Sequence, residues 1–240
     1  MQKKTALITG ASRGIGRAIA EKFAEAGYDL ILTCVNSGKE LETFAEGLRE
    51  DFHGNYTCFC GDLSDPAVCD ELFSRIGSLD VLVNNAGISQ RGLLTDLTQE
   101  DWAKIVGINL SAPLYLSKLA IPLFLKKEEG CIINISSVWG EVGASCEVAY
   151  SATKGGLNAF SRALGKELAP SRIRVNAISC GLIDTQMNAC LSADEMETLI
   201  ESIPADRAGK PEDVAQLALM LAESNDYLTG QVIRLDGAWI

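Results

Sequence analysis

The sequence predicts an α/β fold in which a parallel sheet is covered by helices on both faces. Short β-branched and apolar runs alternate along the chain with longer stretches that have the period of an amphipathic helix. The strand candidates are apolar along most of their length, as expected for strands that are buried on both faces. This alternation is typical of a doubly wound sheet.

Seven strands are predicted, at residues 5–9, 28–33, 55–60, 81–84, 131–136, 174–179 and 232–235. Helices are predicted between them, at residues 14–26, 39–51, 67–76, 99–125, 149–168, 193–200 and 212–222. A chain of 240 residues can bury a substantial core. Because no linker rich in Pro, Gly or Ser divides it, we expect one catalytic domain over residues 1–240.

The least regular segment is 181–209, where glycines and a proline flank a short amphipathic helix. It follows the carboxyl end of a predicted strand, which is where ligands bind in open α/β sheets. Both a substrate lid and an ordinary surface excursion fit this pattern.

Charge and hydropathy exclude several classes of function. The formal net charge is −11, so the overall field repels nucleic acid and anionic membranes. The first four residues lead directly into an apolar strand, which leaves no room for a signal peptide. We find no apolar span free of charge over about 18 residues, so we expect no membrane helix and a cytoplasmic location.

The eight cysteines (34, 58, 60, 69, 131, 146, 180 and 190) are interpreted as reduced, small, buried residues. Cys58 and Cys60 would share one face of a strand, which would suit a metal site. However, the only histidine is His53, and no CxxC spacing completes a tetrahedral set of ligands. We therefore predict no metal.

A glycine-rich loop, TGASRGIG at residues 9–16, joins the first strand to the first helix. Gly10, Gly14 and Gly16 allow positive φ angles and let backbone N–H groups approach a pyrophosphate at the positive end of the helix. Such a turn can also serve only to relieve crowding, but the strand before it and the helix after it favour a dinucleotide site.

The end of the second strand bears on which dinucleotide is bound. None of residues 34–37, CVNS, is acidic, so no carboxylate is there to bind the ribose hydroxyls and exclude a 2′-phosphate. Arg13 would reach that phosphate, with Asn36, Ser37 and Lys39 adding donors. This favours NADP(H) over NAD(H), unless Arg13 is only a solvated surface charge.

Two further turns border the same cleft. Asp62 closes the third strand and would accept a hydrogen bond from an adenine amino group, although it could instead cap the next helix. Asn85 and Gly87 belong to NNAG at the end of the fourth strand, where small residues and amides suit a backbone that passes close to a ligand. That turn could equally be structural.

Tyr150 and Lys154 are four residues apart on a predicted helix and therefore share one face. Ser137 follows a strand, at the edge where doubly wound sheets carry their chemistry. An ammonium about 5 Å from the phenol, at an effective dielectric near 20, would favour the phenolate by roughly 3 kcal/mol and lower the pKa of Tyr150 by about two units. Tyr150 would then exchange a proton with a ketone or alcohol oxygen, which Ser137 orients.

In this order the motifs resemble those of the short-chain dehydrogenase/reductase family over essentially all 240 residues. The resemblance implies a seven-stranded Rossmann sheet, a catalytic tetrad and a homotetramer or homodimer built through the two long helices and the last strand. The implied tetrad is Asn109, Ser137, Tyr150 and Lys154, in which Lys154 also binds the nicotinamide ribose. The implied cofactor contacts are Gly10, Ser12, Arg13, Gly14, Ile15, Gly16, Asn36, Ser37, Asp62, Leu63, Asn85, Ala86, Gly87, Tyr150, Lys154, Gly181 and Ile183.

Within that family, ASRGIGRAIA near the start and RAGKPEDVA at residues 207–215 are most similar to 3-oxoacyl-acyl-carrier-protein reductases. Two features depart from this pattern: the acidic chain disfavours an acidic carrier protein unless a basic patch exists near Lys126, Arg172 or Arg174, and Cys180 replaces a usual proline. SSVWG at 136–140 and GASCE at 143–147 instead resemble an elongation factor P 5-aminopentanone reductase.

The resemblance leaves the substrate open. Trp139 and Glu147 would border it, where a carboxylate attracts an amine-bearing ketone; alternatively Trp139 packs in the core or at a subunit contact and Glu147 is solvated. The leading hypothesis is NADPH-dependent reduction of a 3-oxoacyl thioester. The alternatives are the same chemistry on an aminoketone, a steroid or a small alcohol, or a nucleotide-binding sensor that has lost catalysis. A serine hydrolase lacks a suitably placed histidine.

Overall fold

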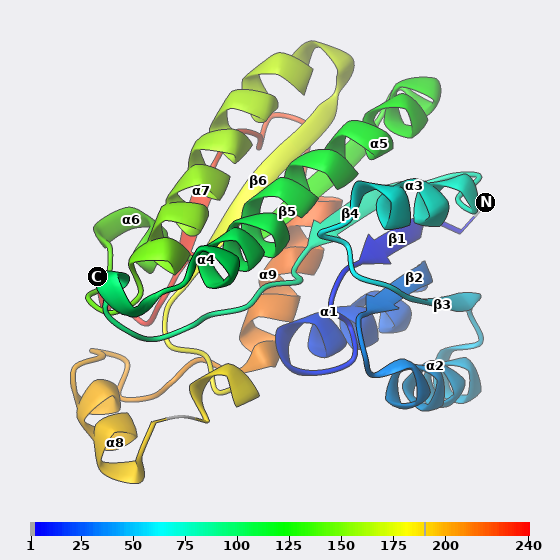
Figure 1. The fold of residues 1–240 in the computed structure, drawn as a ribbon. Coiled ribbons are helices and arrows are strands. Elements are labelled where there is room, and N and C mark those ends of the chain that lie inside the picture. The colour runs from blue at the N-terminus through cyan, green and yellow to red at the C-terminus, as the bar shows by residue number, and fades with distance from the viewer. Residues whose placement is uncertain (1–2, 190) are drawn as a thin grey trace.

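The computed structural model describes residues 3–189 and 191–240 and contains a seven-stranded, all-parallel sheet (Figure 1). Its strands are β1 Thr5–Ile8, β2 Asp29–Cys34, β3 Tyr56–Cys60, β4 Val81–Asn84, β5 Gly130–Ser137, β6 Ile173–Cys180 and β7 Val232–Leu235. The spatial order is β3-β2-β1-β4-β5-β6-β7, so the winding direction reverses between β1 and β4. That reversal opens a crevice at the carboxyl ends of the strands. The predicted fold class is confirmed.

Helices cover both faces of the sheet (Figure 1). One face carries α1 Gly14–Glu25, α2 Gly38–Phe52 and α9 Pro211–Glu223. The other carries α3 Pro66–Ser74, α4 Gln99–Val106, α5 Ala112–Lys127 and α7 Val148–Leu168. Two short helices that face the crevice, α6 Trp139–Val142 and α8 Ala193–Glu201, follow the carboxyl ends of β5 and β6. Helix α6 was not predicted.

The predicted helix at 99–125 is interrupted. A capping box between Thr98 and Asp101 starts α4, and a π-helical turn at Gly107–Ser111 separates α4 from α5. A π turn inserts an extra residue and so rotates the side chains within it relative to the flanking helix. Here it turns Asn109 inward, where the residue is fully buried.

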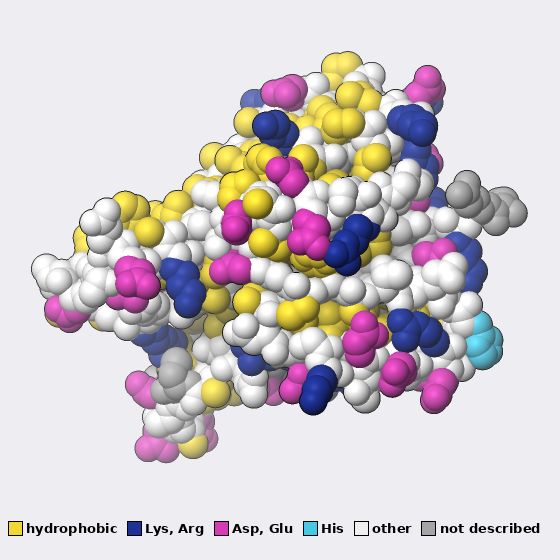
Figure 2. Space-filling view, turned by 45° about the vertical axis from the view of Figure 1, so that its right-hand side comes forward, with side chains coloured by type: hydrophobic (Ala, Val, Ile, Leu, Met, Phe, Trp, Pro, Cys, Tyr) yellow, Lys and Arg dark blue, Asp and Glu magenta, His cyan; other side chains and the backbone are white. Residues whose placement is uncertain are grey.

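The same stretch, Gln99–Lys127, is the one part of the described chain that is long and apolar enough to cross a membrane by length and composition. In this fold it packs on the sheet instead, and Leu116, Ala120 and Phe124 of α5 belong to the core beneath it. Other apolar residues of the stretch are exposed, among them Trp102, Leu114 and Leu125. In Figure 2, hydrophobic side chains gather over the upper part of the molecule, where Figure 1 places α5 and α7.

The cysteines fit their predicted role only in part. Cys34, Cys69, Cys131 and Cys180 are buried, but Cys60 and Cys146 are exposed, so the buried interpretation is wrong for those two. Cys190 lies outside the described residues. Within residues 3–189 and 191–240, no group of three or more His, Cys, Asp or Glu side chains is arranged to hold a metal ion.

Candidate active site

Ser137 is the last residue of β5, at the edge of the crevice. Its Cα pairs with that of Cys180 at the end of β6, so two neighbouring strands end together here. The Ser137 hydroxyl accepts a hydrogen bond from the backbone N–H of Trp139 at 3.2 Å. This bond fixes the turn into α6 and holds the Ser137 oxygen at the carboxyl end of the sheet.

Tyr150 and Lys154 lie on successive turns near the start of α7, which packs beside β5. The Ser137 hydroxyl lies close enough to the Tyr150 phenol to lower the pKa of that phenol. The Lys154 ammonium lies 5.6 Å from the centre of the Tyr150 ring and donates to the carbonyl of Ile135 at 2.8 Å. The three side chains that the sequence singled out are therefore in one cluster.

Burial dominates the electrostatics of this cluster. It raises the pKa of Tyr150 above its ordinary value of 10.0, against the lowering effect of the Ser137 hydroxyl, and the nearby Cys180 and Glu147 raise the pKa further. It also lowers the pKa of Lys154 from 10.5 to about 8. The predicted fall in the pKa of Tyr150 is therefore wrong, because the desolvation of the buried phenolate is the largest effect on that group.

Asn109 joins this cluster through the π turn. Its side-chain oxygen accepts from the N–H of Ile88 at 2.9 Å, and its amide nitrogen donates to the carbonyl of Ile88 at 2.8 Å. The amide nitrogen also lies 3.3 Å from the hydroxyl of Thr153, next to Lys154. Asn109 thus ties the loop after β4 to α7, and all four residues of the predicted tetrad lie at one end of the sheet.

The NNAG turn packs tightly against both the tetrad and the glycine-rich loop. The N–H groups of Asn85 and Ala86 both donate to the hydroxyl of Thr9 at 2.9 Å, and the Asn85 amide donates to the carbonyl of Thr9. A Cβ at Gly87 would lie 3.3 Å from the Asn109 oxygen and 3.6 Å from the Lys154 ammonium. Asn84 is structural and donates to Asn134 on β5.

The glycine-rich loop has the geometry that a pyrophosphate requires. Gly10 and Gly14 have φ angles of +67° and +55°, and a Cβ at Gly16 would stand 2.3 Å from the Gly10 carbonyl oxygen. The loop therefore brings bare backbone to the amino end of α1, where helix N–H groups point outward. Of its other predicted contacts, Ser12 is partly exposed in the loop and Ile15 packs against the core.

A cavity at the carboxyl ends of β1–β4 continues from this loop. Its walls include five predicted or neighbouring residues, namely Gly10, Thr33, Asp62, Leu63 and Ala86. Asn36 and Ser37 lie in the turn after β2, beside this cavity. Asp65 caps α3 by accepting a hydrogen bond from the N–H of Ala67, so Asp62 is not the capping residue of that helix. These residues fit the adenosine half of a dinucleotide.

The segment after β6 closes over the glycine-rich loop. Arg13 donates to the side chain of Gln186 at 2.9 Å. Ile183, which is buried, forms a parallel bridge with Gly209, so the two ends of the 181–209 segment are joined. A Cβ at Gly181 would meet Asp236 at 2.7 Å, which places the start of the segment against the chain after β7.

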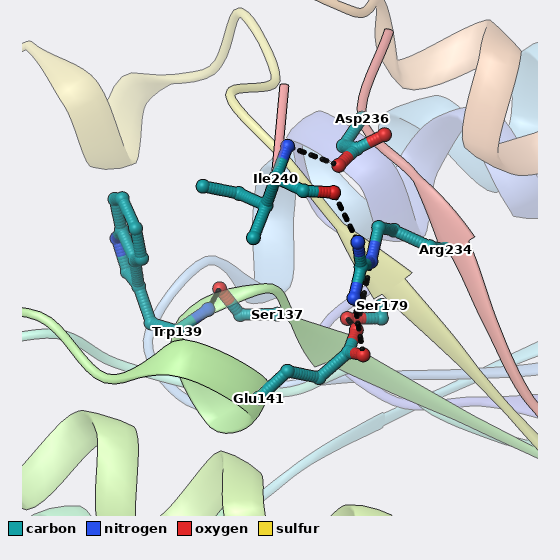
Figure 3. A network of polar contacts seen from close by, with 7 residues as sticks. All are labelled: Ser137, Trp139, Glu141, Ser179, Arg234, Asp236 and Ile240. Carbon is teal, nitrogen blue, oxygen red and sulfur yellow. Dashed lines mark hydrogen bonds and ion pairs between the residues drawn. The ribbon is translucent and has the colours of Figure 1, made fainter. Parts of the chain in front are cut away.

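Several side chains beside Ser137 were not singled out from the sequence. Figure 3 shows Glu141, Ser179, Arg234, Asp236 and Ile240 in one polar network next to Ser137 and Trp139. Arg234 and Glu141 form an ion pair at 2.8 Å, and the guanidinium holds the pKa of that carboxyl below its usual range. No local motif marks these residues, because the network joins α6, β6, β7 and the chain after β7.

Glu147 and Trp139, which were expected to border the substrate, lie on two sides of the cluster. Glu147 directly precedes α7, and its carboxylate accepts from the hydroxyl of Ser89. The Trp139 ring packs edge-on against Trp239, with ring centres 5.1 Å apart. Neither side chain is fully exposed.

Comparison with known proteins agrees with this architecture. A family model described as short chain dehydrogenase matches residues 4–196. The chain is 40% identical to the uncharacterized oxidoreductase YmfI of Bacillus subtilis, over 98% of both chains. It is 38% identical to the 3-oxoacyl-[acyl-carrier-protein] reductase FabG of Aquifex aeolicus, over 99% of this chain and 97% of the relative.

Solved structures have the same fold. The crystal structure of YwfH, an NADPH dependent reductase involved in bacilysin biosynthesis, superposes with a TM-score of 0.93. The two sequences are 30% identical, and the match covers 100% of this chain and 99% of the other. The likeness therefore includes the segment after β6 and the strand β7.

Proposed function

The chain belongs to the short-chain dehydrogenase family of oxidoreductases, and from that membership we propose that it reduces a ketone with NADPH. One observation carries the proposal: Ser137, Tyr150 and Lys154 converge beside a loop and a cavity shaped for a dinucleotide. When bound, the reduced nicotinamide supplies a hydride to the carbonyl carbon.

Tyr150 is the proton donor in this mechanism. Its pKa is raised by burial, so the phenol keeps its proton at neutral pH and can act as an acid. The ketone oxygen accepts hydrogen bonds from Ser137 and Tyr150, and as the carbon gains the hydride the oxygen becomes an alkoxide. The Tyr150 proton moves to that oxygen, which leaves the alcohol product and a phenolate.

Lys154 and Asn109 support the phenolate. With a pKa of about 8, Lys154 is mostly charged at neutral pH, and its ammonium stabilises the negative phenolate that forms next to it. Asn109 positions the loop after β4 and α7 through its contacts with Ile88 and Thr153. Its place beside Lys154 suits the proton relay that the family resemblance implies.

For the cofactor, NADPH is favoured over NADH. The cavity beside β2 has no acidic residue among 34–37 that would repel a 2′-phosphate, and Arg13 lies in the loop at the start of α1. Gly10, Gly14 and Gly16 would hold the pyrophosphate. Asp62 would bind the adenine, and the turn at 85–87 and Lys154 would lie along the nicotinamide half.

The preferred substrate is a 3-oxoacyl thioester. Similarity to the reductase of Aquifex aeolicus over nearly the whole chain supports it. The basic residues considered for docking a carrier protein weaken the case for the protein-bound form. Arg172 pairs with Glu128, and Arg174 is buried and donates to the last carbonyls of α9.

A second candidate is an amine-bearing ketone, and the position of Glu147 favours it. Its carboxylate lies close enough to Tyr150 to raise the pKa of the phenol. A cationic group on a substrate would be attracted to the same carboxylate. This candidate keeps the mechanism and changes only the substrate.

The deciding assay follows the loss of NADPH absorbance with an acetoacetyl thioester, beside NADH and a panel of aminoketones and cyclic ketones. Rapid turnover of the thioester supports the preferred substrate, whereas turnover of an aminoketone alone supports the second candidate. We expect Tyr150→Phe to lose roughly 10²–10⁴-fold in kcat, because the proton donor is gone, while NADPH affinity changes little. Full activity of Tyr150→Phe would refute the assigned chemistry.

The same proposal includes one catalytic domain over residues 1–240, with 181–209 as a substrate lid that the Arg13–Gln186 bond holds against the dinucleotide loop. It also includes a homotetramer or homodimer through α5, α7 and β7. The exposed Leu114 and Leu125 on α5 support that interface, and light scattering tests it. A cytoplasmic location is part of the same proposal.

A further inference from the structure

The chain after β7 folds back over the candidate active site. The Asp236 carboxylate accepts from the backbone N–H groups of Ala238 and Ile240 at 3.0 and 3.1 Å. Gly237 and Ala238 both have a φ angle of +67°, which turns the chain sharply. Arg234 then donates to the Ile240 carbonyl, so the end of this segment is held against β7. We refer to residues 236–240 as the C-terminal hook.

The hook is tied to the turn that carries Ser137. Arg234, which holds Ile240, also forms an ion pair with Glu141 of α6 at 2.8 Å. Glu141 in turn accepts from the Ser179 hydroxyl near the end of β6. Figure 3 shows Ile240 extending from this network toward the side on which Trp139 and Ser137 lie.

Trp239 connects the hook to two further elements. Its ring meets the Trp139 ring edge-on, at 5.1 Å between centres and 62° between planes. Its indole N–H donates to the hydroxyl of Ser202, directly after α8, at 2.9 Å. Trp239 therefore bridges the Ser137 turn and the 181–209 segment.

The topology indicates which side of the crevice remains for a substrate. The dinucleotide cavity lies over β1–β4, where Gly10, Asp62 and Ala86 line it. A ketone held at Ser137 and Tyr150 must therefore extend its substituents toward the β5–β7 side. There it meets α6, α8 and the hook, whose large side chains include Trp139, two residues after Ser137, and Trp239, which packs on the Trp139 ring.

We propose that Trp239 is a specificity-determining residue, which with Trp139 forms an aromatic wall of the ketone pocket and selects substrates with an extended apolar substituent. The inference rests on the proposed ketone reduction at Ser137 and Tyr150. The polar groups behind the wall do not compete for the substrate, because Arg234 is satisfied by Glu141 and by the Ile240 carbonyl. The wall therefore contributes apolar contact and no free cation.

The test compares kcat and KM for two thioesters of N-acetylcysteamine, acetoacetyl and 3-oxooctanoyl, with saturating NADPH. Trp239→Ala removes apolar contact from the longer chain only, so we expect its KM to rise roughly tenfold while kcat stays within about threefold. The acetoacetyl thioester should be nearly unaffected. Trp102→Ala, which removes an exposed tryptophan on α4, is the matched control.

Two further variants separate the wall from a merely structural role. Trp239→Phe keeps a ring against Trp139 and should restore most of the chain-length preference, even if Trp239→Ala folds poorly. Ser202→Ala removes only the partner of the indole N–H and should leave the preference intact. If the ratio of the KM values for the two thioesters is the same as in the wild type in both Trp239 variants, the proposal that Trp239 forms a wall of the ketone pocket is wrong.

The two proposals fail differently. If the wild-type chain reduces no ketone in the panel, the proposed function is wrong, and the proposal about Trp239, which depends on it, is wrong too. If it reduces ketones in a Tyr150-dependent way but Trp239→Ala keeps the wild-type chain-length preference, only the wall is wrong.

Discussion

The two sides of the crevice differ in the groups that form their surfaces. On the β1–β4 side, the surface is backbone and small side chains, with the Thr9 hydroxyl holding the N–H groups of Asn85 and Ala86, and Gly16 pressed against Gly10. On the β5–β7 side it consists of large side chains that meet from distant elements, such as Trp139 with Trp239. The difference suggests that the dinucleotide side has a shape set by local chain geometry, whereas the ketone side can change with single substitutions.

The sharpest test of this comparison adds a single methyl group to the backbone of the dinucleotide side, by the substitution Gly16→Ala. A Cβ at Gly16 would lie 2.3 Å from a backbone oxygen, so Gly16→Ala must shift the loop. We expect a loss of about 1–3 kcal/mol in the free energy of unfolding. NADPH affinity, measured by fluorescence titration, should fall at least about tenfold.

Gly47 provides the matched control, because it lies on α2 and a Cβ there meets nothing within 4 Å. Gly47→Ala should stabilise the chain by about 0.5–1 kcal/mol, since alanine favours a helix over glycine. Wild-type stability and NADPH binding in Gly16→Ala would show that the loop is not held as tightly as its geometry indicates.

The same contrast explains what could be predicted from the sequence. The glycines at 10, 14 and 16 have local conformational causes, so the loop, the positions of the strands and the α7 pair were predictable from periodicity and spacing. The hook was not, because Trp239 meets Trp139 only after β5 and β7 have been placed in the sheet.

Two further differences between the prediction and the structure have physical causes that the hydrophobic period of the sequence does not reveal. The π turn around Asn109 interrupts a continuous apolar pattern, and a hydrophobic period of a helix does not reveal one extra residue. The pKa of Tyr150 was predicted to fall because the charge of Lys154 was considered without the desolvation of both groups. Burial, which depends on the whole fold, reverses the direction.

The catalytic cluster between the two sides should also lower the stability of the fold, and the buried Lys154 is the residue at which to measure this cost. Burial lowers its pKa from 10.5 to about 8, so between these values the unfolded chain binds more protons than the folded chain. Stability due to this group therefore rises with pH from about 8 to 10.5, and the full penalty, about 3 kcal/mol, applies below pH 8. Lys154→Met removes the penalty and should be more stable than wild type near pH 7, although inactive.

The measurement is urea unfolding of both proteins from about pH 7 to about pH 10. The advantage of Lys154→Met should shrink as the pH rises, and Tyr150 and the cysteines, present in both proteins, cancel in the difference. A pH-independent difference would mean that the ammonium of Lys154 is not desolvated in the folded chain.

Arg13 tests an exception to this comparison, because here a single side chain would decide the preference of the dinucleotide side for NADPH over NADH. Arg13→Ala should weaken NADPH binding roughly tenfold, the value of one charged hydrogen bond in a partly exposed site, and leave NADH binding within about twofold. Arg17→Ala, one turn further along α1 where the guanidinium stacks on Phe44, controls for the loss of a positive charge.

Gln186→Ala removes the present partner of Arg13 and should not change the ratio of the NADPH and NADH affinities. If Arg13→Ala weakens NADPH and NADH equally, Arg13 acts through the 181–209 segment and the 2′-phosphate must be bound elsewhere.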